Sequence, residues 1–314
     1  MGFWIARPQA ECVGSVYQKT VIFKQISHLK GRECRRAVVV LEESAQVMYD
    51  GGGVNLHCGD QRDVSARNET RLYLHMKKWI EKAVMDYGMI EAGDRILVGV
   101  SGGSDSLVLL DLLDTPMIYV PAFSLVAVNI DMGFDPAYRG YGVLEEYLTQ
   151  RGYDYVMEKT DIGPLSHSRF NRKNPCFLCS RLRRKRIFEI AADRGCNKIA
   201  FAHHRDDIIE TLLINLFYGR EISTMMPNQE IFGGRLHMIR PLCYLSENLI
   251  KKYGAERELP IIENGCPTSP VSRRSYIKKL IAELERENED IRDNIWRAMA
   301  HVKTDYLPSK GGGP

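Results

Sequence analysis

The feature that most constrains this chain is the hexapeptide Ser-Gly-Gly-Ser-Asp-Ser at residues 101–106. Residues 95–100 come before it and form a short apolar, β-branched run that is typical of a buried parallel strand. Residues 107–113 follow it, and their leucines and valine have a spacing that fits a helix. A glycine turn between a strand and a helix presents free backbone N–H groups and the positive end of the helix dipole. The hexapeptide therefore predicts a site that binds phosphate.

Asp105 adds a condition to this prediction, because a carboxylate repels phosphate unless a cation such as Mg²⁺ lies between them. The rest of the hexapeptide would supply hydroxyl and backbone N–H donors: Ser101, Gly102, Gly103, Ser104 and Ser106. An ordinary strand-to-helix turn with a serine cap is the simpler alternative, but it does not explain why a strand, paired glycines and an acid occur together. No Gly-Lys-Ser/Thr sequence follows the glycines, so the loop is not a Walker A motif.

Strands and helices alternate through the middle of the chain, which predicts an α/β fold with a doubly wound parallel sheet covered on both faces. Strands are expected at residues 95–100, 123–130, 155–157 and 198–202. Helices are expected at residues 72–84, 107–113, 143–148, 177–193 and 207–218. Ligands of such sheets bind at the carboxyl ends of the strands. We therefore expect Ser101, Asp131 and His203, each at a strand end, to lie close together.

The two ends of the chain lack this alternation. Residues 1–66 show no sustained hydrophobic period, and we interpret them as a poorly defined N-terminal extension, either loosely ordered or a small accessory unit. The main domain covers residues 67–305 and closes with a C-terminal helical segment, of which Ile277 and Ile281 share an apolar face. Residues 306–314 are expected to form a flexible tail.

The composition favours a globular protein in a reducing compartment. Hydrophobic residues make up 44% of the chain, which is enough for a core and excludes a wholly disordered protein. No apolar run approaches the roughly 18 residues that span a bilayer, and the N-terminus does not resemble a signal peptide. We therefore expect a cytoplasmic protein, in which the eight cysteines are metal ligands, catalytic groups or buried thiols rather than disulfides.

Cys176 and Cys179 form a Cys-x-x-Cys pair at the start of a predicted helix, where the helix dipole stabilises thiolates. Three chemistries remain open for this pair: a redox dithiol, half of a zinc site, or part of an iron–sulfur site. Cys266 stands in an exposed-looking turn, where no structural thiol is needed. Cys196 and Cys243 have apolar or turn surroundings and are expected to be core or turn thiols.

The run His-His-Arg-Asp-Asp at residues 203–207 follows the fourth predicted strand. Such a run can bind Mg²⁺, act as acid and base, or cap the next helix. As an isolated pattern, the run favours a helix cap. It resembles, however, a His-His-x-Asp-Asp-x-x-Glu-Thr stretch of the PP-loop tRNA-modifying enzymes, and this resemblance implies that His203 and Asp207 line the ATP site.

Residues 169–186 contain eight basic residues and no acid, which favours a polyanion partner, most simply an RNA backbone. From this basic block we select Arg181, Arg183 and Arg184 as RNA-binding residues. Phe170 and Phe177 are expected to belong to the core rather than to stack on bases.

The hexapeptide resembles the Ser-Gly-Gly-x-Asp-Ser loop of the PP-loop ATP pyrophosphatases. Three further runs resemble the tRNA 2-thiocytidine synthetase family: Cys-x-x-Cys-Ser-Arg-Leu-Arg-Arg at 176–184, the run at 203–207, and Ile-Arg-Pro-Leu at 239–242, followed by a later cysteine. The likeness covers about residues 68–303. It implies a fold like that of the adenine nucleotide alpha hydrolases and an ATP-dependent tRNA sulfurtransferase. That enzyme adenylates the C2 oxygen of the cytidine at position 32, which opens the anticodon loop, and replaces this oxygen with sulfur.

Carried onto this chain, the resemblance implies a [4Fe–4S] cluster on Cys176, Cys179 and Cys266, with one iron left free to hold sulfide. These cysteines and Asp105 would be the catalytic residues, and ATP and Mg²⁺ would bind at the hexapeptide. The implied partners are tRNA and a sulfur donor such as a cysteine desulfurase, and a homodimer is left open. Two positions depart from the family: Ser104 replaces the lysine of many relatives, and Pro267-Thr268 replaces a polar run.

Three other functions stay open at this point. A PP-loop tRNA thiolase could act on a different base. A small-molecule ATP-dependent ligase would keep the loop, but it would not explain the cysteines or the basic block. A non-enzymatic iron–sulfur sensor that binds RNA would explain these two features without a reaction.

Overall fold

The computed structural model describes residues 70–307, except for 116, 121, 135–139, 170, 172–174, 263–265 and 267–271. The chain divides into two compact units, residues 1–68 and residues 69–314. In the first unit the structure describes the antiparallel pairing of two short strands, β1 (Tyr49–Asp50) and β2 (Gly53–Val54). The rest of the predicted N-terminal extension lies outside the described residues, as do residues 308–314 of the predicted tail.

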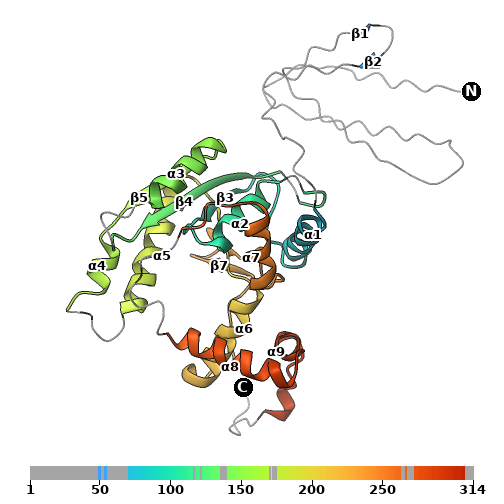
Figure 1. Ribbon diagram of the computed structural model, residues 1–314, viewed down its shortest axis with the longest axis vertical. Helices are drawn as coiled ribbons and strands as arrows, with labels where there is room; N and C mark the ends of the chain where they lie inside the picture. Colours follow the sequence, from blue (N-terminus) through green and yellow to red (C-terminus); the bar gives the residue numbers. More distant parts are fainter. Residues whose placement is uncertain are drawn as a thin grey trace, which may run out of the picture. The chain divides into compact units, whose positions relative to one another are not determined.

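The second unit is built on a six-stranded sheet with the strand order β5–β4–β3–β6–β8–β7 (Figure 1). Its strands are β3 (Arg95–Gly99), β4 (Ser124–Asp131), β5 (Tyr155–Lys159), β6 (Lys198–Ala200), β7 (Asn228–Ile231) and β8 (Leu236–Ile239). The first five in this order run parallel, and β7 is antiparallel to β8. The four predicted strands and the α/β class are confirmed, but the sheet is mixed rather than wholly parallel.

The helices connect these strands. They are α1 (Arg71–Asp86), α2 (Ser104–Leu113), α3 (Gly140–Gln150), α4 (Ile162–Ser166), α5 (Pro175–Asp193), α6 (Arg205–Ile214), α7 (Glu247–Glu256), α8 (Arg273–Glu287) and α9 (Ile291–Ala298). The predicted helix over residues 207–218 is only partly α-helical, because α6 gives way to a π-helical turn, Asn215–Gly219. A short 3-10 turn, Thr304–Tyr306, follows α9. No helix in the described part of the chain is long and apolar enough to cross a membrane.

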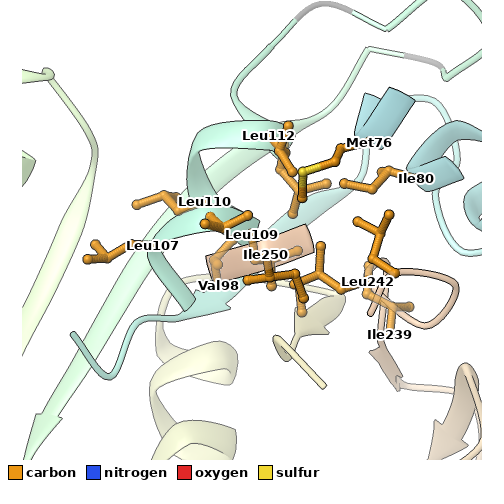
Figure 2. Close-up of a cluster of buried hydrophobic side chains, with 14 of the residues drawn as sticks. Met76, Ile80, Val98, Leu107, Leu109, Leu110, Leu112, Ile239, Leu242 and Ile250 are labelled. Carbon is orange, nitrogen blue, oxygen red and sulfur yellow. The ribbon is translucent and has the colours of Figure 1, made fainter. Parts of the chain in front are cut away.

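The two faces of the sheet carry separate hydrophobic clusters, because successive strand residues point to opposite sides. On one face, Ile96 and Val98 of β3 join the larger cluster with side chains from α1, α2 and α7 (Figure 2). On the other face, Leu97 packs with Ile187 and Ile190 of α5. Each large apolar side chain buried in this way contributes about 1.5–3 kcal/mol.

The strand order places a topological switch between β3 and β6. The chain moves from β3 outward to β4 and β5, and then returns through α4 and α5 to β6 on the other side of β3. Because the connections that leave β3 and β6 diverge, a crevice opens at the carboxyl edge of the sheet. Helix α5 starts beside this edge, since it follows the end of β5 and leads back to the start of β6.

The C-terminal helices α8 and α9 add a small third cluster. Ile277 and Ile281 of α8 are fully buried with Ile209 of α6, which confirms the apolar face that the sequence predicted for this segment. The C-terminal helices therefore support the helix that begins at the switch point.

Candidate active site

A cavity of about 520 Å³ lies at the carboxyl ends of the central strands. This volume is typical of a small-molecule site. Most of the residues selected from the sequence line it: Ser101, Gly103, Asp105, Ser106, Cys176, Cys179, Arg183, Arg184, His203, Asp207 and Cys266. Four selected residues do not line it: Gly102, Ser104, Asp131 and Arg181.

The hexapeptide loop is held in shape by its own hydroxyl groups. The Ser106 hydroxyl accepts a hydrogen bond from the backbone N–H of Ser101 (3.0 Å) and donates one to the carbonyl of Gly103 (2.9 Å). Gly102 has a φ of +86°, and a Cβ there would lie 3.0 Å from the side chain of Ile262. Glycine is therefore required at position 102 for the turn itself, although the residue does not line the cavity.

The N-terminus of α2 faces the cavity without a side-chain cap. Its N-cap residue is Gly103, in extended conformation, and no side chain accepts a hydrogen bond from the first turn within the described residues. The Ser104 hydroxyl instead donates to the Asp105 carboxylate (2.9 Å). The first backbone N–H groups of α2 remain available to an anion.

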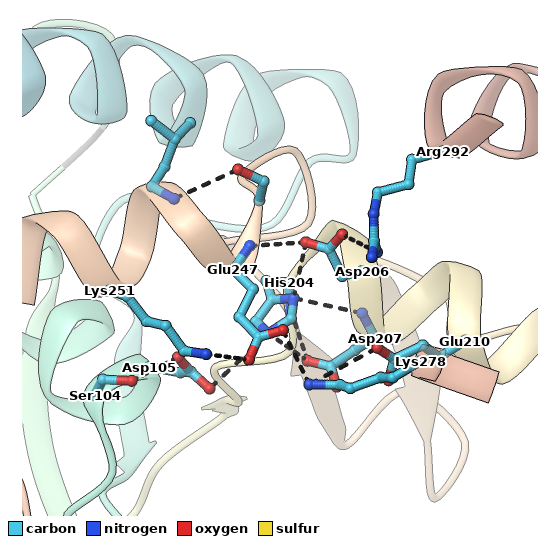
Figure 3. Close-up of polar contacts among 12 residues, drawn as sticks. Ser104, Asp105, His204, Asp206, Asp207, Glu210, Glu247, Lys251, Lys278 and Arg292 are labelled. Carbon is cyan, nitrogen blue, oxygen red and sulfur yellow. Dashed lines mark hydrogen bonds and ion pairs between the residues drawn. The ribbon is translucent and has the colours of Figure 1, made fainter. Parts of the chain in front are cut away.

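The N-terminus of α6, in contrast, is closed by a capping box (Figure 3). The backbone N–H of Asp207 donates to Nδ1 of His204 (3.4 Å), and the backbone N–H of His204 donates to Oδ2 of Asp207 (3.1 Å). His204 is buried, and its Nε2 lies 3.9 Å from Oδ2 of Asp105. The capping alternative therefore holds for His204, and this residue links the two junctions at the switch point.

His203 lines the cavity as a neutral base. Burial lowers its pKa to about 4, and the nearby charges of Arg240 and Arg274 act in the same direction, against that of Asp207. Nδ1 of His203 accepts a hydrogen bond from Nε of Arg240 (3.3 Å). The sequence did not lead us to Arg240, although a charged residue inside the apolar run 239–242 was a usable signal.

The three cysteines selected from the sequence lie on the wall of this one cavity, although Cys266 is distant in sequence. Burial raises the pKa of the Cys179 thiol, and the neighbouring Cys266 and Cys176 raise it further, whereas Arg183 lowers it. Cys196 and Cys243 are buried outside the cavity, as expected. Within the described residues, no three His, Cys, Asp or Glu side chains form a group that would hold a single metal ion.

Asp131 closes its own turn instead of lining the cavity. Its Oδ1 accepts a hydrogen bond from the backbone N–H of Gly133 (2.8 Å). The residues on either side, Ile130 and Met132, line the cavity in its place. Asp131 lies at the carboxyl edge of the sheet, as its position at the end of the strand predicts, but a local hydrogen bond directs its carboxylate away from the cavity.

The basic block of α5 is divided between the cavity and the surface. Arg183 and Arg184 line the cavity, whereas Arg181 is exposed outside it and Arg186 pairs with Glu158. The prediction that Phe177 belongs to the core was wrong, because its side chain is 67% exposed on the first turn of the helix. Phe170 lies outside the described residues.

A layer of ion pairs behind α6 was not predicted. Arg274 of α8 pairs with Asp207. Arg292 of α9 pairs with the buried Asp206 at 2.6 Å (Figure 3). Glu210 is fully buried, and its oxygens make no hydrogen bond within the described part of the chain. Lys278 lies 3.8 Å from Glu210, and burial raises the pKa of the Glu210 carboxyl to about 7. These contacts join residues 60 or more positions apart, so local sequence patterns could not reveal them.

The chain is similar to a known domain family and to named proteins. The protein-family model of the PP-loop domain matches residues 72–284 of this chain. The tRNA-cytidine(32) 2-sulfurtransferase of Geotalea daltonii is 39% identical over 247 residues, which cover 77% of this chain and 97% of that protein. The protein of the same name from Burkholderia vietnamiensis is 38% identical over 268 residues, covering 84% of this chain and 78% of that protein.

Among solved structures, the U34-tRNA thiolase NcsA from Methanococcus maripaludis, with its [4Fe-4S] cluster, has a similar fold. Its TM-score is 0.61 at 22% identity, over 76% of this chain and 80% of that chain. The fold that the resemblance implied is confirmed. This chain belongs to the PP-loop family and, within it, to the tRNA-cytidine(32) 2-sulfurtransferases.

Proposed function

We propose that this chain uses ATP to replace the C2 oxygen of a tRNA cytidine with sulfur, at the position 32 that its relatives' names give. One observation carries the proposal: the uncapped start of α2, Asp105 and the three cysteines Cys176, Cys179 and Cys266 all line one cavity. An activated base and a sulfur source must meet before water reaches the adenylate. A single cavity that holds both sets of groups meets this requirement.

In the activation step, the C2 oxygen attacks the α-phosphorus of ATP, the new O–P bond forms, and pyrophosphate leaves. The N–H groups at the start of α2 and the Ser101 hydroxyl would bind the departing phosphates. Asp105 and Asp207 would hold Mg²⁺. Magnesium commonly takes only one or two protein carboxylates and fills its other positions with phosphate oxygens and water. The absence of a group of three ligands among the described residues is compatible with such a site.

In the second step, sulfide attacks C2, the C–S bond forms, and the C–O bond breaks to release AMP. The donor set for a [4Fe–4S] cluster fits, because Cys176, Cys179 and Cys266 share the cavity wall, and Cys266 and Cys176 are near enough to raise the pKa of the Cys179 thiol. A cluster binds each thiolate at a different iron, so the sulfurs need not converge on a single point. When bound, the cluster would supply an iron without a protein ligand for carrying sulfur. A cysteine desulfurase would be the sulfur donor, with a thiol reductant supplying the two electrons that release sulfide from its persulfide.

The outer surface of α5 would contact the tRNA. Arg181 is exposed and would bind the phosphate backbone, and the exposed Phe177 offers a ring to an unpaired base of the anticodon loop. Both residues lie within one or two turns of the cysteines on the same helix. We further propose that the protein is cytoplasmic. A homodimer stays a prediction, which analytical ultracentrifugation would test.

The test of the activation step is release of pyrophosphate from ATP by the anaerobically purified chain. We expect this chain to release pyrophosphate only when tRNA is present. A small-molecule ligase would release pyrophosphate without tRNA, and a sensor would release none. Asp105→Ala should lower the rate more than about 100-fold, because phosphate charge is no longer offset by the metal. Asp114→Ala, at the other end of α2, is the matched control. Near-normal release by the Asp105 variant would make the hexapeptide a plain turn.

The test of the sulfur step is mass spectrometry of nucleosides from the treated tRNA, together with iron analysis. We expect 2-thiocytidine and about four irons per chain. Cys176→Ala, Cys179→Ala or Cys266→Ala should remove both, whereas Cys196→Ala should remove neither, because Cys196 is buried outside the cavity. Full iron content in the Cys266 variant would contradict its role as a ligand.

A further inference from the structure

Three guanidinium groups line the cavity without a carboxylate partner. Arg183 and Arg184 come from α5, and Arg240 follows β8. None of the three forms an ion pair with an Asp or Glu within the described residues, whereas some buried or half-buried cations elsewhere are paired. Arg292, for example, lies 2.6 Å from Asp206, and the buried Lys198 lies 2.8 Å from Asp94.

An unpaired cation in such a place is costly. Arg240 is 5% exposed, and burial lowers its pKa to about 10, with the like charge of Arg184 acting in the same direction. Arg183 is half-buried, and Arg184 is exposed at the rim of the cavity. Like charges that share a cavity repel each other unless an anion lies between them. The arrangement is therefore typical of a site that is completed by a bound anion.

The position of this anion follows from the elements that carry the arginines. Arg183 lies one helical turn after Cys179, so its side chain is next to that thiol along α5. Arg240 leaves the carboxyl end of β8, and β6 separates β8 from β3, which leads into the hexapeptide. Neighbouring strands lie about 4.8 Å apart, so the two strand ends are roughly 10 Å apart. The anion would therefore lie beside the cysteines, apart from the uncapped start of α2.

We infer that Arg183, Arg184 and Arg240 form a second phosphate subsite, distinct from the hexapeptide loop. This inference rests on the proposed function and assigns a division of labour within it. The loop would bind the pyrophosphate that leaves first, and the arginines would bind the phosphate that stays on the adenylated base. Guanidinium groups placed there would also stabilise the charge on AMP as the C–O bond breaks.

The test is calorimetric titration of the full chain with AMP and, separately, with pyrophosphate. Arg183→Gln and Arg184→Gln should each weaken AMP binding by about tenfold or more, because each removes a charge-assisted hydrogen bond. Pyrophosphate affinity should change much less. Lys185→Gln removes a charge from the same helix outside the cavity and should leave AMP affinity unchanged. Arg240 is buried, so the variant Arg240→Lys is chosen because it keeps the positive charge and limits any loss of stability. This variant should weaken AMP binding less than Arg183→Gln.

A phosphodiester of the tRNA offers the same chemistry as AMP, so a second titration separates the two sources. If AMP affinity is unchanged but tRNA affinity and its dependence on salt both fall, the subsite binds RNA phosphate. If neither ligand is affected by any of the variants, the inference is overturned. If AMP affinity falls although the wild-type chain forms no 2-thiocytidine, the subsite stands and the proposed function fails.

Discussion

The two strand-to-helix junctions at the switch point use the same local geometry in opposite ways. After β3, helix α2 begins at Gly103, without a side-chain cap. After β6, helix α6 begins at His204, whose ring and backbone N–H complete a capping box with Asp207. The first junction leaves its backbone N–H groups available to a ligand. The second junction uses its backbone N–H groups in the capping box and presents side chains to the cavity instead. A helix N-terminus next to a site is therefore an anion site only where the chain leaves it uncapped.

The closed junction is also supported from outside. Arg274 of α8 pairs with Asp207, and Arg292 of α9 pairs with Asp206, so the first turn of α6 is fixed by the C-terminal helices. Within the described residues, the open junction is held by its own serines, by a backbone hydrogen bond in which the N–H of Ile262 donates to the carbonyl of Gly102 (2.8 Å), and by the contact between Asp105 and His204 (3.9 Å). The part that binds ligand is thus held by a short loop, and the part that orients side chains is held by a tertiary network.

Opening the closed junction should have the largest effect. His204→Ala removes the cap of α6 and leaves a void at a buried position, so we expect a loss of about 2 kcal/mol in the free energy of unfolding. His204→Asn restores a side-chain acceptor at the N-cap and should recover part of this loss. Urea denaturation of the three proteins measures both effects. An alanine variant as stable as the wild type would show that α8 and α9 alone hold α6.

Much of this fold was predictable because the parallel strands are buried on both faces and appear as apolar runs. The same topology brought Ser101, His203 and Asp207 to one cavity without further assumptions. The β7–β8 hairpin was missed because its strands are four residues long and β7 is rich in polar residues, although Gly233-Gly234 marks its turn.

What the sequence could not predict depends on contacts between distant segments. Arg274 meets Asp207 only because α8 packs on α6, and Asp131 leaves the cavity because of a hydrogen bond to Gly133. Phe177 was assigned to the core from its residue type, but its position on α5 faces solvent. Residue type and spacing thus predicted the edge of the sheet at which the site lies, whereas tertiary packing determines which side chains reach the cavity.

Closing the open junction should have the next largest effect. Gly103→Ser places a hydroxyl at the N-cap of α2, where a Cβ would meet only ordinary contacts, the nearest being the Ser101 hydroxyl at 3.6 Å. Serine caps a helix slightly better than glycine, so stability should rise by a few tenths of a kcal/mol. ATP affinity should fall about tenfold, because the new hydroxyl competes with phosphate for the same N–H groups. Unchanged affinity, measured by calorimetry, would show that these N–H groups do not contact the nucleotide.

The smallest effect should come from the outermost pair that supports α6. Arg205 lies 2.7 Å from Asp293 of α9, and their side chains are 24% and 47% exposed, so water screens the attraction. Asp293→Asn should therefore cost less than about 1 kcal/mol in the free energy of unfolding. Asp206→Asn is the matched contrast, because Asp206 is buried, pairs with Arg292 and accepts a hydrogen bond from the backbone N–H of Glu247 (2.7 Å). The substitution removes one of the two carboxylate partners of the half-buried Arg292, the other being Glu285, and because Asp206 itself is buried it should cost several times more. Equal costs for the two variants in urea denaturation would mean that α9 is held by its apolar contacts and that the ion pairs do not stabilise the junction.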